Sequence, residues 1–432
     1  MSVKNLVSEF VKEAPPYVVG ADEQSKSMRP GVTKLLQLAT NENPFGTSPK
    51  AAEAICQQAP LANRYPDVRA QDLRKKLAEK HGLSVDEVMV TEGATAGLGF
   101  IAEVFIQPGD EIILTPPTYP SYYNYVKRCR GKLVEVPLEE DTLTPDFNKV
   151  LAAITDKTKA IFLCNPNNPT ATLIDSDELH AFQKKLPEHV LLVVDEAYID
   201  FVEDPNYRTM VDAIADDENL IVVRTFSKLY GMAGARMGYL MANREIIEYL
   251  QRDSTGFCCS RMGLHAAEAA LDDVEFQEMT KKGNREGREI LVSCMKELGF
   301  RVWPSHTNFI YFDPGVDVKW FADRLLDYGI IIRGNFKANR ISIGTPEEDR
   351  FVCKAMREIM AYLRRQNELE EATDLVIGNY VYEKVSEGSR TVMHYRNVFP
   401  EGREFGWDEV GHFSQSQYLL MHSVIYRTEL LR

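Results

Sequence analysis

The sequence lacks the marks of a secreted, disulfide-stabilised protein. Its seven cysteines are odd in number and follow no framework spacing, and Met1–Asn5 begins no apolar signal segment. Scattered cysteines of this kind are typical of reduced thiols, so we expect a cytoplasmic location. The eight histidines form no zinc-type cluster with the cysteines. We therefore predict no metal site.

Excess positive charge and long apolar runs are also missing. Lys and Arg number 50 against 64 for Asp and Glu, which gives a formal net charge of −14. Because phosphate backbones attract basic surfaces, we do not expect nucleic acid as a partner. No apolar run is long enough to cross a membrane. The 432 residues, 44% of them hydrophobic, are enough for a large core and two domains.

The strongest indication of chemistry follows the apolar run at 220–223, which is typical of a buried strand in a parallel sheet. Lys228 comes just after this run, where α/β enzymes keep their catalytic groups. Thr225 and Ser227 supply hydroxyls beside it, and Arg236 can hold an anion with its planar guanidinium. This set suits a cofactor with an aldehyde and a phosphate, because the lysine amine can bond to the aldehyde. Taken alone, the stretch also fits a surface lysine in a glycine-rich turn.

Two further motifs change that balance: Asn-Pro-Asn-Asn-Pro-Thr at 165–170 and Val-Val-Asp-Glu-Ala-Tyr at 193–198. With the lysine stretch, and in this order, they resemble the fold-type I pyridoxal-phosphate aminotransferases, in particular the histidinol-phosphate group. The resemblance covers roughly the first 360 residues. It implies an α/β fold with a mostly parallel central sheet flanked by helices, and a smaller α+β domain. It also implies pyridoxal 5'-phosphate as cofactor, and exchange of an amino group between an amino substrate and a 2-oxo acid.

The resemblance assigns roles around the cofactor ring. Lys228 bears the cofactor and moves a proton. Asp195 pairs with the ring nitrogen and keeps the ring an electron sink, although a helix cap is an alternative role. Asn168 and Tyr198 bond to the phenolic oxygen, and Tyr119 stacks on the ring, unless it only packs a helix start.

The phosphate site is expected where a helix begins after the strand at 88–91. Free backbone N–H groups and the positive end of the helix dipole suit a phosphate there. By resemblance the phosphate ligands of one chain are Gly93, Ala94, Thr95, Thr225, Ser227 and Arg236. Tyr65 matches a tyrosine that contacts the phosphate of the other subunit, which implies a homodimer with shared active sites.

The substrate site is expected to use two arginines and the N-terminal arm. Arg340 matches the arginine that receives a carboxylate through two parallel hydrogen bonds. Arg333 matches a position near the distal phosphate of histidinol phosphate, and Tyr17 matches a tyrosine near the substrate. The alternatives are surface ion pairs for the arginines and a flexible tail for the arm.

Three departures from the family pattern leave the substrate open: Thr95-Ala96, Ala171 and Cys258-Cys259 replace an acidic pair, a glycine and an asparagine-bearing stretch. They favour, as an alternative, a pyridoxal-phosphate oxidase, cyclase or decarboxylase that acts on an arginine-like amino acid. A ligand-sensing regulator on the same scaffold is a remote alternative, since the aminotransferase pattern starts close to the N-terminus. The paired cysteines are expected to be packed side chains and not catalytic groups.

The pattern divides the chain into an N-terminal arm with part of the small domain (1–44), a large cofactor-binding domain (45–245), a small domain (246–365) and an extension of unknown role (366–432). The elements expected outside the motifs are a helix at 70–81 ending at Gly82, a helical region at 262–298 with a break near 272–273, a strand at 301–312 and a helix at 346–365.

Overall fold

The computed structural model describes residues 32–254, 256–371, 380–387 and 390–397, together with a few positions before residue 32. It divides the chain into two compact units, Met1–Arg357 and Glu358–Arg432. Tyr17 lies outside the described residues.

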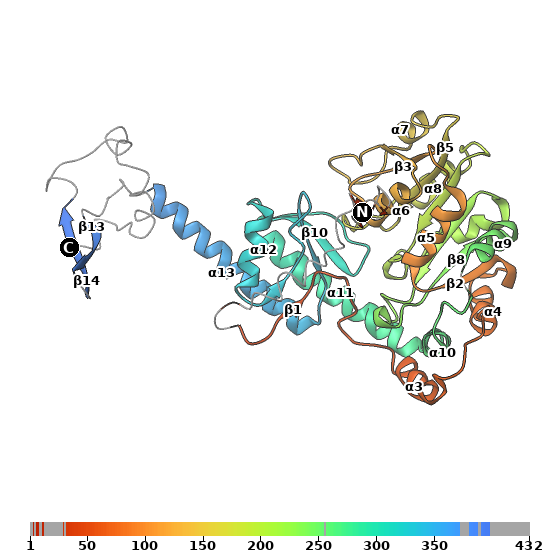
Figure 1. The fold of residues 1–432 in the computed structure, drawn as a ribbon, viewed down its shortest axis with the longest axis horizontal. Coiled ribbons are helices and arrows are strands. Elements are labelled where there is room, and N and C mark those ends of the chain that lie inside the picture. Colours follow the sequence, from red (N-terminus) through yellow and green to blue (C-terminus); the bar gives the residue numbers. More distant parts are fainter. Residues whose placement is uncertain are drawn as a thin grey trace. The chain divides into compact units, whose positions relative to one another are not determined.

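A seven-stranded sheet forms the centre of the first unit (Figure 1). Its strands, in spatial order, are β2 (Val88–Thr91), β8 (Gly238–Ala242), β7 (Leu220–Thr225), β6 (Leu191–Asp195), β5 (Thr158–Cys164), β3 (Glu111–Leu114) and β4 (Lys132–Glu135). β8 alone runs in the opposite direction to the other six strands of this sheet, so the predicted mostly parallel sheet is confirmed. The strand β8 was not predicted from the sequence.

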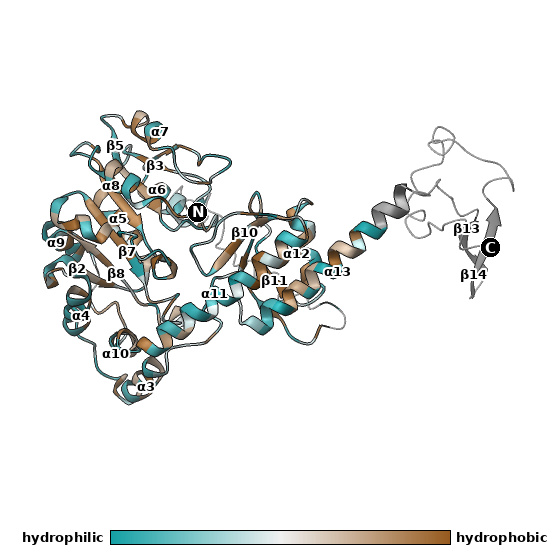
Figure 2. Ribbon diagram, turned by 180° about the vertical axis from the view of Figure 1, so that it is seen from behind, coloured by the Kyte–Doolittle hydropathy of each residue, from teal (hydrophilic) through white to brown (hydrophobic). Residues whose placement is uncertain are grey.

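Helices cover both faces of this sheet. One face packs against α5 (Ala94–Phe105), α6 (Ser121–Arg128) and α9 (Arg244–Asp253). The other packs against α4 (Gln71–His81), α7 (Phe147–Ala152), α8 (Ser176–Gln183) and α10 (Arg261–Leu271), with α3 (Pro49–Gln58) against α10. Because both faces are buried, the central strands are largely apolar, and much of the sheet is brown in Figure 2. The edge strand β4 differs, since Lys132 and Glu135 are exposed. In β6, for example, Leu191 and Val193 face one helical layer while Leu192 and Val194 face the other.

Local signals set several helix ends. Gly82 closes α4 in the left-handed conformation, with φ of 66°, and donates its N–H to the carbonyls of Ala78 and Glu79. The expected break near residues 272–273 separates α10 from α11 (Val274–Glu297). In α5, Gly97 allows close approach to the sheet, because a β-carbon there would lie 2.7 Å from Leu240 Cδ2.

A smaller group of strands follows. β10 (Phe309–Asp313) lies between β9 (Arg301–Val302) and β12 (Asn339–Ser342), and β1 (Leu36–Gln37) pairs in parallel with β11 (Ile330–Ile331). The pairing of β1 agrees with the expected contribution of the N-terminal segment to a small domain. The division into large and small domains stays a prediction.

The single strand expected at 301–312 is wrong, since residues 303–308 separate β9 from β10. Pro304 has no N–H to donate to a ladder. The hydroxyls of Ser305 and Thr307 both donate to the carbonyl of Phe309, which offers the backbone an alternative to strand pairing.

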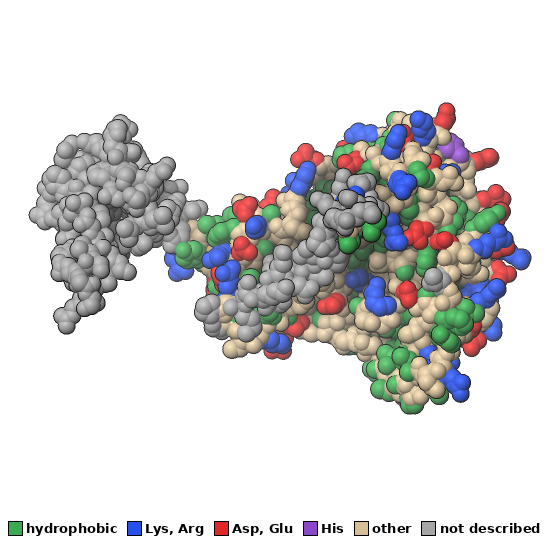
Figure 3. All heavy atoms as spheres, viewed as in Figure 1, with side chains coloured by type: hydrophobic (Ala, Val, Ile, Leu, Met, Phe, Trp, Pro, Cys, Tyr) green, Lys and Arg blue, Asp and Glu red, His purple; other side chains and the backbone are tan. Residues whose placement is uncertain are grey.

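The last long helix, α13 (Pro346–Glu371), extends beyond the expected end at residue 365. After it, β13 (Tyr380–Glu387) and β14 (Arg390–Asn397) form an antiparallel hairpin in the predicted extension. None of the described helices is long and apolar enough to cross a bilayer. Acidic and basic side chains are interspersed over the face shown in Figure 3.

Candidate active site

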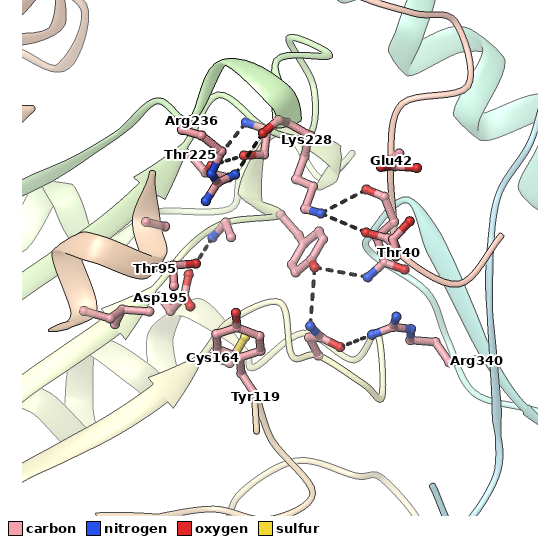
Figure 4. Close-up of a pocket in the computed structure, with 18 of the residues that line it drawn as sticks. Thr40, Glu42, Thr95, Tyr119, Cys164, Asp195, Thr225, Lys228, Arg236 and Arg340 are labelled. Atoms are coloured by element: carbon pink, nitrogen blue, oxygen red, sulfur yellow. Dashed lines mark hydrogen bonds between the residues drawn. The ribbon is translucent and has the colours of Figure 1, made fainter. Parts of the chain in front are cut away.

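A cavity of about 430 Å³ lies at the carboxyl ends of the parallel strands, beside the N-terminus of α5 (Figure 4). Parallel sheets bring residues from separate strand ends together at this edge. The predicted residues that line it are Ala94, Thr95, Tyr119, Asn168, Asp195, Tyr198, Thr225, Ser227, Lys228, Arg236, Arg333 and Arg340. Most of the predicted site is therefore assembled in one place.

One end of the cavity combines hydroxyls, a guanidinium and a helix N-terminus. The hydroxyl of Thr225 donates to Ser227 Oγ at 2.9 Å. Arg236 takes the left-handed conformation, with φ of 54°, and donates to the carbonyl of Ala233 at 2.9 Å. Gly93 does not line the cavity but makes room for this arginine, because a β-carbon at Gly93 would lie 2.8 Å from Arg236 Nη2. The first N–H groups of α5 have no partners within the helix and add to this anion-favouring end.

Asp195 is buried at the end of β6. Its carboxylate accepts hydrogen bonds from Tyr122 Oη at 2.9 Å and from the backbone N–H of Ala197 at 3.1 Å. Burial raises the pKa of Asp195 to about 6, while these two hydrogen bonds act in the opposite direction. Tyr122 was not predicted from the sequence, because nothing in the sequence distinguishes it from an ordinary core tyrosine of α6.

Lys228 reaches the cavity from the segment after β7. Its Nζ donates to the carbonyls of Asn41, at 3.0 Å, and Thr40, at 3.3 Å. Burial lowers the pKa of Lys228 to about 8, and the positive charge of Arg340 acts in the same direction, while the nearby carboxylate of Glu42 raises it. Residues 40–42 line the cavity, and the sequence analysis assigned them no role.

The middle of the cavity holds a small network around the Tyr198 hydroxyl. This hydroxyl accepts from the side-chain amides of Asn41, at 3.1 Å, and Asn168, at 3.4 Å. The Asn168 oxygen in turn accepts from Arg340 Nη1 at 2.6 Å. Burial raises the pKa of Tyr198, so the hydroxyl keeps its proton and can donate it to a ligand.

Two arginines lie beyond this network. Arg333 and Arg340 face each other across paired backbones, and each side chain donates to the carbonyl of Ala39. In Figure 4, Arg340 lies across the cavity from Arg236. The cavity therefore has a cationic group at each end, and Tyr119 forms part of its wall.

Tyr65 lies away from the cavity of its own chain. The residue is 78% exposed, and its ring packs against Phe257 with the centroids 4.7 Å apart and the planes tilted by 35°. Cys258 and Cys259, next to Phe257, are likewise outside the cavity. Ala171 is buried against Tyr198 and Phe309 with φ of 64°, so this chain keeps the left-handed turn that a glycine would favour.

A lysine and an aspartate face one cavity at the carboxyl ends of the parallel strands, and an arginine lies at each end of that cavity. This arrangement defines an α/β enzyme of the aminotransferase type. Residues 33–356 match the family of class I and II aminotransferases, and the chain belongs to this family. The family and the enzyme class predicted from the motifs are thereby confirmed.

Known relatives support the same assignment. The chain is 37% identical to histidinol-phosphate aminotransferase of Brevibacillus brevis over 355 residues, or 81% of this chain and 97% of that protein. It is 35% identical to the Moorella thermoacetica enzyme of that name over 82% of this chain and 92% of the relative. The crystal structure of the Sinorhizobium meliloti histidinol-phosphate aminotransferase in complex with pyridoxal 5'-phosphate has a TM-score of 0.77 at 29% identity, covering 83% of this chain and 98% of that one. This chain is an aminotransferase similar to histidinol-phosphate aminotransferases.

The raised pKa of Asp195 gives a prediction for stability without added cofactor. The folded pKa of about 6 lies above the ordinary value of 3.8, so this group favours folding below pH 4, and its contribution is lost as pH rises through about 6. Asp195→Asn removes the buried charge and keeps the shape. At pH 7 the free energy of unfolding of the variant should exceed that of the parent by up to about 3 kcal/mol. Denaturant titrations at pH 4 and pH 7 measure this, and a difference that does not grow with pH contradicts it.

Proposed function

We propose that this aminotransferase holds pyridoxal 5'-phosphate in the cavity and exchanges an amino group between histidinol phosphate, or a related amino substrate, and a 2-oxo acid such as 2-oxoglutarate. The observation that carries the proposal is the placement of Lys228 and Asp195 on one cavity that has a guanidinium at each end.

The residues present fit this cofactor. Arg236, the two hydroxyls beside it and the N-terminus of α5 would hold its phosphate, and Asp195 would pair with its ring nitrogen. The hydroxyl of Thr40 is buried without a hydrogen-bond partner among the described residues, as expected of a group that serves a ligand. Tyr198 and Asn168 would donate to its phenolic oxygen. When bound, the cofactor supplies an electron-withdrawing ring that stabilises negative charge at the substrate α-carbon.

Lys228 would bear the cofactor and move the proton. A pKa of about 8 leaves a useful fraction of its amine neutral near pH 7, as a general base requires. The carbonyls of Thr40 and Asn41 hold that amine in the cavity. Asp195 keeps its charge more easily once a protonated ring nitrogen faces it, because an opposite charge lowers a carboxyl pKa.

Arg340 would bind the carboxylate that the 2-oxo acid carries, and Arg333 would bind a distal anion such as the phosphate of histidinol phosphate. Guanidinium groups suit both tasks, because they offer two parallel donors to carboxylate or phosphate. The histidinol-phosphate names of the relatives support this substrate class.

The alternative reactions on an arginine-like substrate have less support. Of the three departures that favoured them, only Thr95 lines the cavity, whereas Ala171 and the cysteine pair do not. An arginine-like side chain would also bring a second cation toward Arg333.

We also propose that two copies of this chain form a dimer with shared active sites. Tyr65 is largely exposed and lies off its own cavity, which agrees with a role at the cofactor phosphate of a second copy.

The substrate proposal predicts that variants of the two arginines raise the KM of different substrates. With 2-oxoglutarate as acceptor, Arg333→Gln should raise the apparent KM for histidinol phosphate about tenfold or more, because one charge-assisted contact is lost. It should change the KM for 2-oxoglutarate less than Arg340→Lys does. Steady-state kinetics of both variants measure this, with Arg301→Gln, exposed on β9, as matched control. Turnover of arginine in place of histidinol phosphate would contradict the proposal.

The dimer proposal predicts complementation between two defective variants. Lys228→Ala removes the amine, and Tyr65→Ala removes the proposed phosphate contact. If Tyr65 acts on the partner's site, random mixing should restore about one quarter of the parent activity at limiting cofactor, since half the dimers are hybrids with one intact site. Native mass spectrometry checks that hybrids form. Hybrids without restored activity would place Tyr65 outside the partner's site.

A further inference from the structure

A vicinal pair of thiols lies outside the catalytic cavity. Cys258 and Cys259 follow α9 and precede Ser260, the residue that caps the N-terminus of α10. Their sulfur atoms are 3.9 Å apart. A disulfide bond is about 2.0 Å long, so the two atoms would have to approach by about 2 Å. Cys258 is partly exposed and Cys259 is buried.

The two thiols open on a cavity of their own. This second cavity has a volume of about 320 Å³ and shares no lining residue with the catalytic cavity. Asp67, Val68 and Arg69 line the same cavity as Cys258 and Cys259. A small molecule can therefore approach the partly exposed Cys258 without entering the catalytic site.

The two thiols differ in pKa, as thiol–disulfide exchange between them requires. The hydrogen bond from the Cys259 thiol lowers the pKa of Cys258 to about 7, against the opposing effects of burial and the Glu92 carboxylate. The same contact raises the pKa of Cys259. Cys258 is thus the better nucleophile near neutral pH, and Cys259 is a protonated neighbour that can resolve a mixed disulfide.

The cysteine segment is also joined to the loop that carries Tyr65. The Tyr65 ring packs against Phe257, and the Tyr65 carbonyl accepts a hydrogen bond from Arg261 Nη2 at 2.9 Å. A β-carbon on Gly256 would lie 3.4 Å from Val68 Cγ2, which is ordinary van der Waals contact, so the two segments lie side by side. Phe257 itself has φ of 65°, an uncommon conformation for a residue with a side chain. A change in backbone at Cys258 would therefore move the surface on which Tyr65 rests.

We propose that Cys258 and Cys259 form a redox-active dithiol that low-molecular-weight disulfides oxidise to a vicinal disulfide, and that this oxidation weakens cofactor binding by displacing Tyr65. The second half rests on the proposed role of Tyr65 at the partner's cofactor phosphate. The first half depends only on the thiols and their cavity.

The small disulfide is the only oxidant that this reaction needs. The Cys258 thiolate attacks one sulfur of the small disulfide, forms a mixed disulfide and releases one small thiolate. The Cys259 thiol loses its proton to solvent, and its sulfur attacks Cys258 Sγ and releases the second small thiolate. Two protein thiols are oxidised to one disulfide, and the small disulfide is reduced to two thiols, which take up the protons.

Peptide mapping tests the chemistry. The holoenzyme is equilibrated with mixtures of reduced and oxidised glutathione, quenched in acid, alkylated and digested. The peptide with both cysteines should lose two hydrogens without retaining glutathione, and dithiothreitol should reverse the loss. Cys258→Ser should abolish the product, while Cys56→Ser, at an exposed lone cysteine, should leave it unchanged. Two alkylated thiols at every ratio, or a stable mixed disulfide at Cys258, would overturn the proposal.

Equilibrium dialysis against pyridoxal 5'-phosphate tests the consequence. The oxidised protein should bind the cofactor about tenfold more weakly than the reduced protein, the effect of losing one hydrogen bond to a charged group. Cys258→Ser should show no such dependence. Equal affinity in a sample whose disulfide is proven by mass would overturn the link to Tyr65. If Tyr65→Phe binds the cofactor as the parent does, the shared-site proposal fails while the thiol chemistry stands.

Discussion

Two ionisable side chains, the half-buried Lys228 and the buried Asp195, face one cavity, and much of the surrounding structure serves to hold them there. Burial opposes the charge on each: it lowers the pKa of the amine to about 8 and raises that of the carboxyl to about 6. Tyr122 and the N–H of Ala197 stabilise the carboxylate, and two backbone carbonyls hold the amine. The strand ends bring the two side chains to one edge of the sheet.

A second buried pair fixes the strands that carry these groups. Arg224 and Glu196 each lie next to a site residue, Thr225 and Asp195, but their side chains point to the opposite face of the sheet because side chains alternate along a strand. Arg224 donates twice to one Glu196 oxygen, at 2.7 and 3.0 Å, and the other oxygen accepts from the backbone N–H of Met210. Removing one partner of such a buried pair typically costs about 3–5 kcal/mol. This pair joins the ends of β6 and β7, and the pairing of these two strands sets the relative positions of Asp195 and Lys228.

The sequence alone was informative where the signal is local. The apolar run at 220–223 located β7 and so Lys228, and the motifs at 165–170 and 193–198 located Asn168 and Asp195. These residues meet because strand ends at one edge of a parallel sheet converge. It was uninformative where a contact joins distant segments: the Asn41 carbonyl that holds Lys228 is 187 residues away in sequence, and no local pattern encodes that distance. Tyr122 was missed because a buried hydrogen bond leaves no periodic pattern in the sequence. The break at 303–308 was missed because side-chain hydroxyls that bond to the backbone leave none either.

Covalent mapping of the cofactor on the holoenzyme tests the central claim most directly. Sodium borohydride fixes pyridoxal 5'-phosphate to the amine that bears it, and digestion with mass spectrometry then identifies the residue. Lys228 should be the modified lysine, and Lys228→Arg, which keeps the charge without a reactive amine, should carry no modification. A cofactor fixed to another lysine in the parent protein, or a parent with bound cofactor and no fixed label, would contradict the assignment of this cavity as the active site.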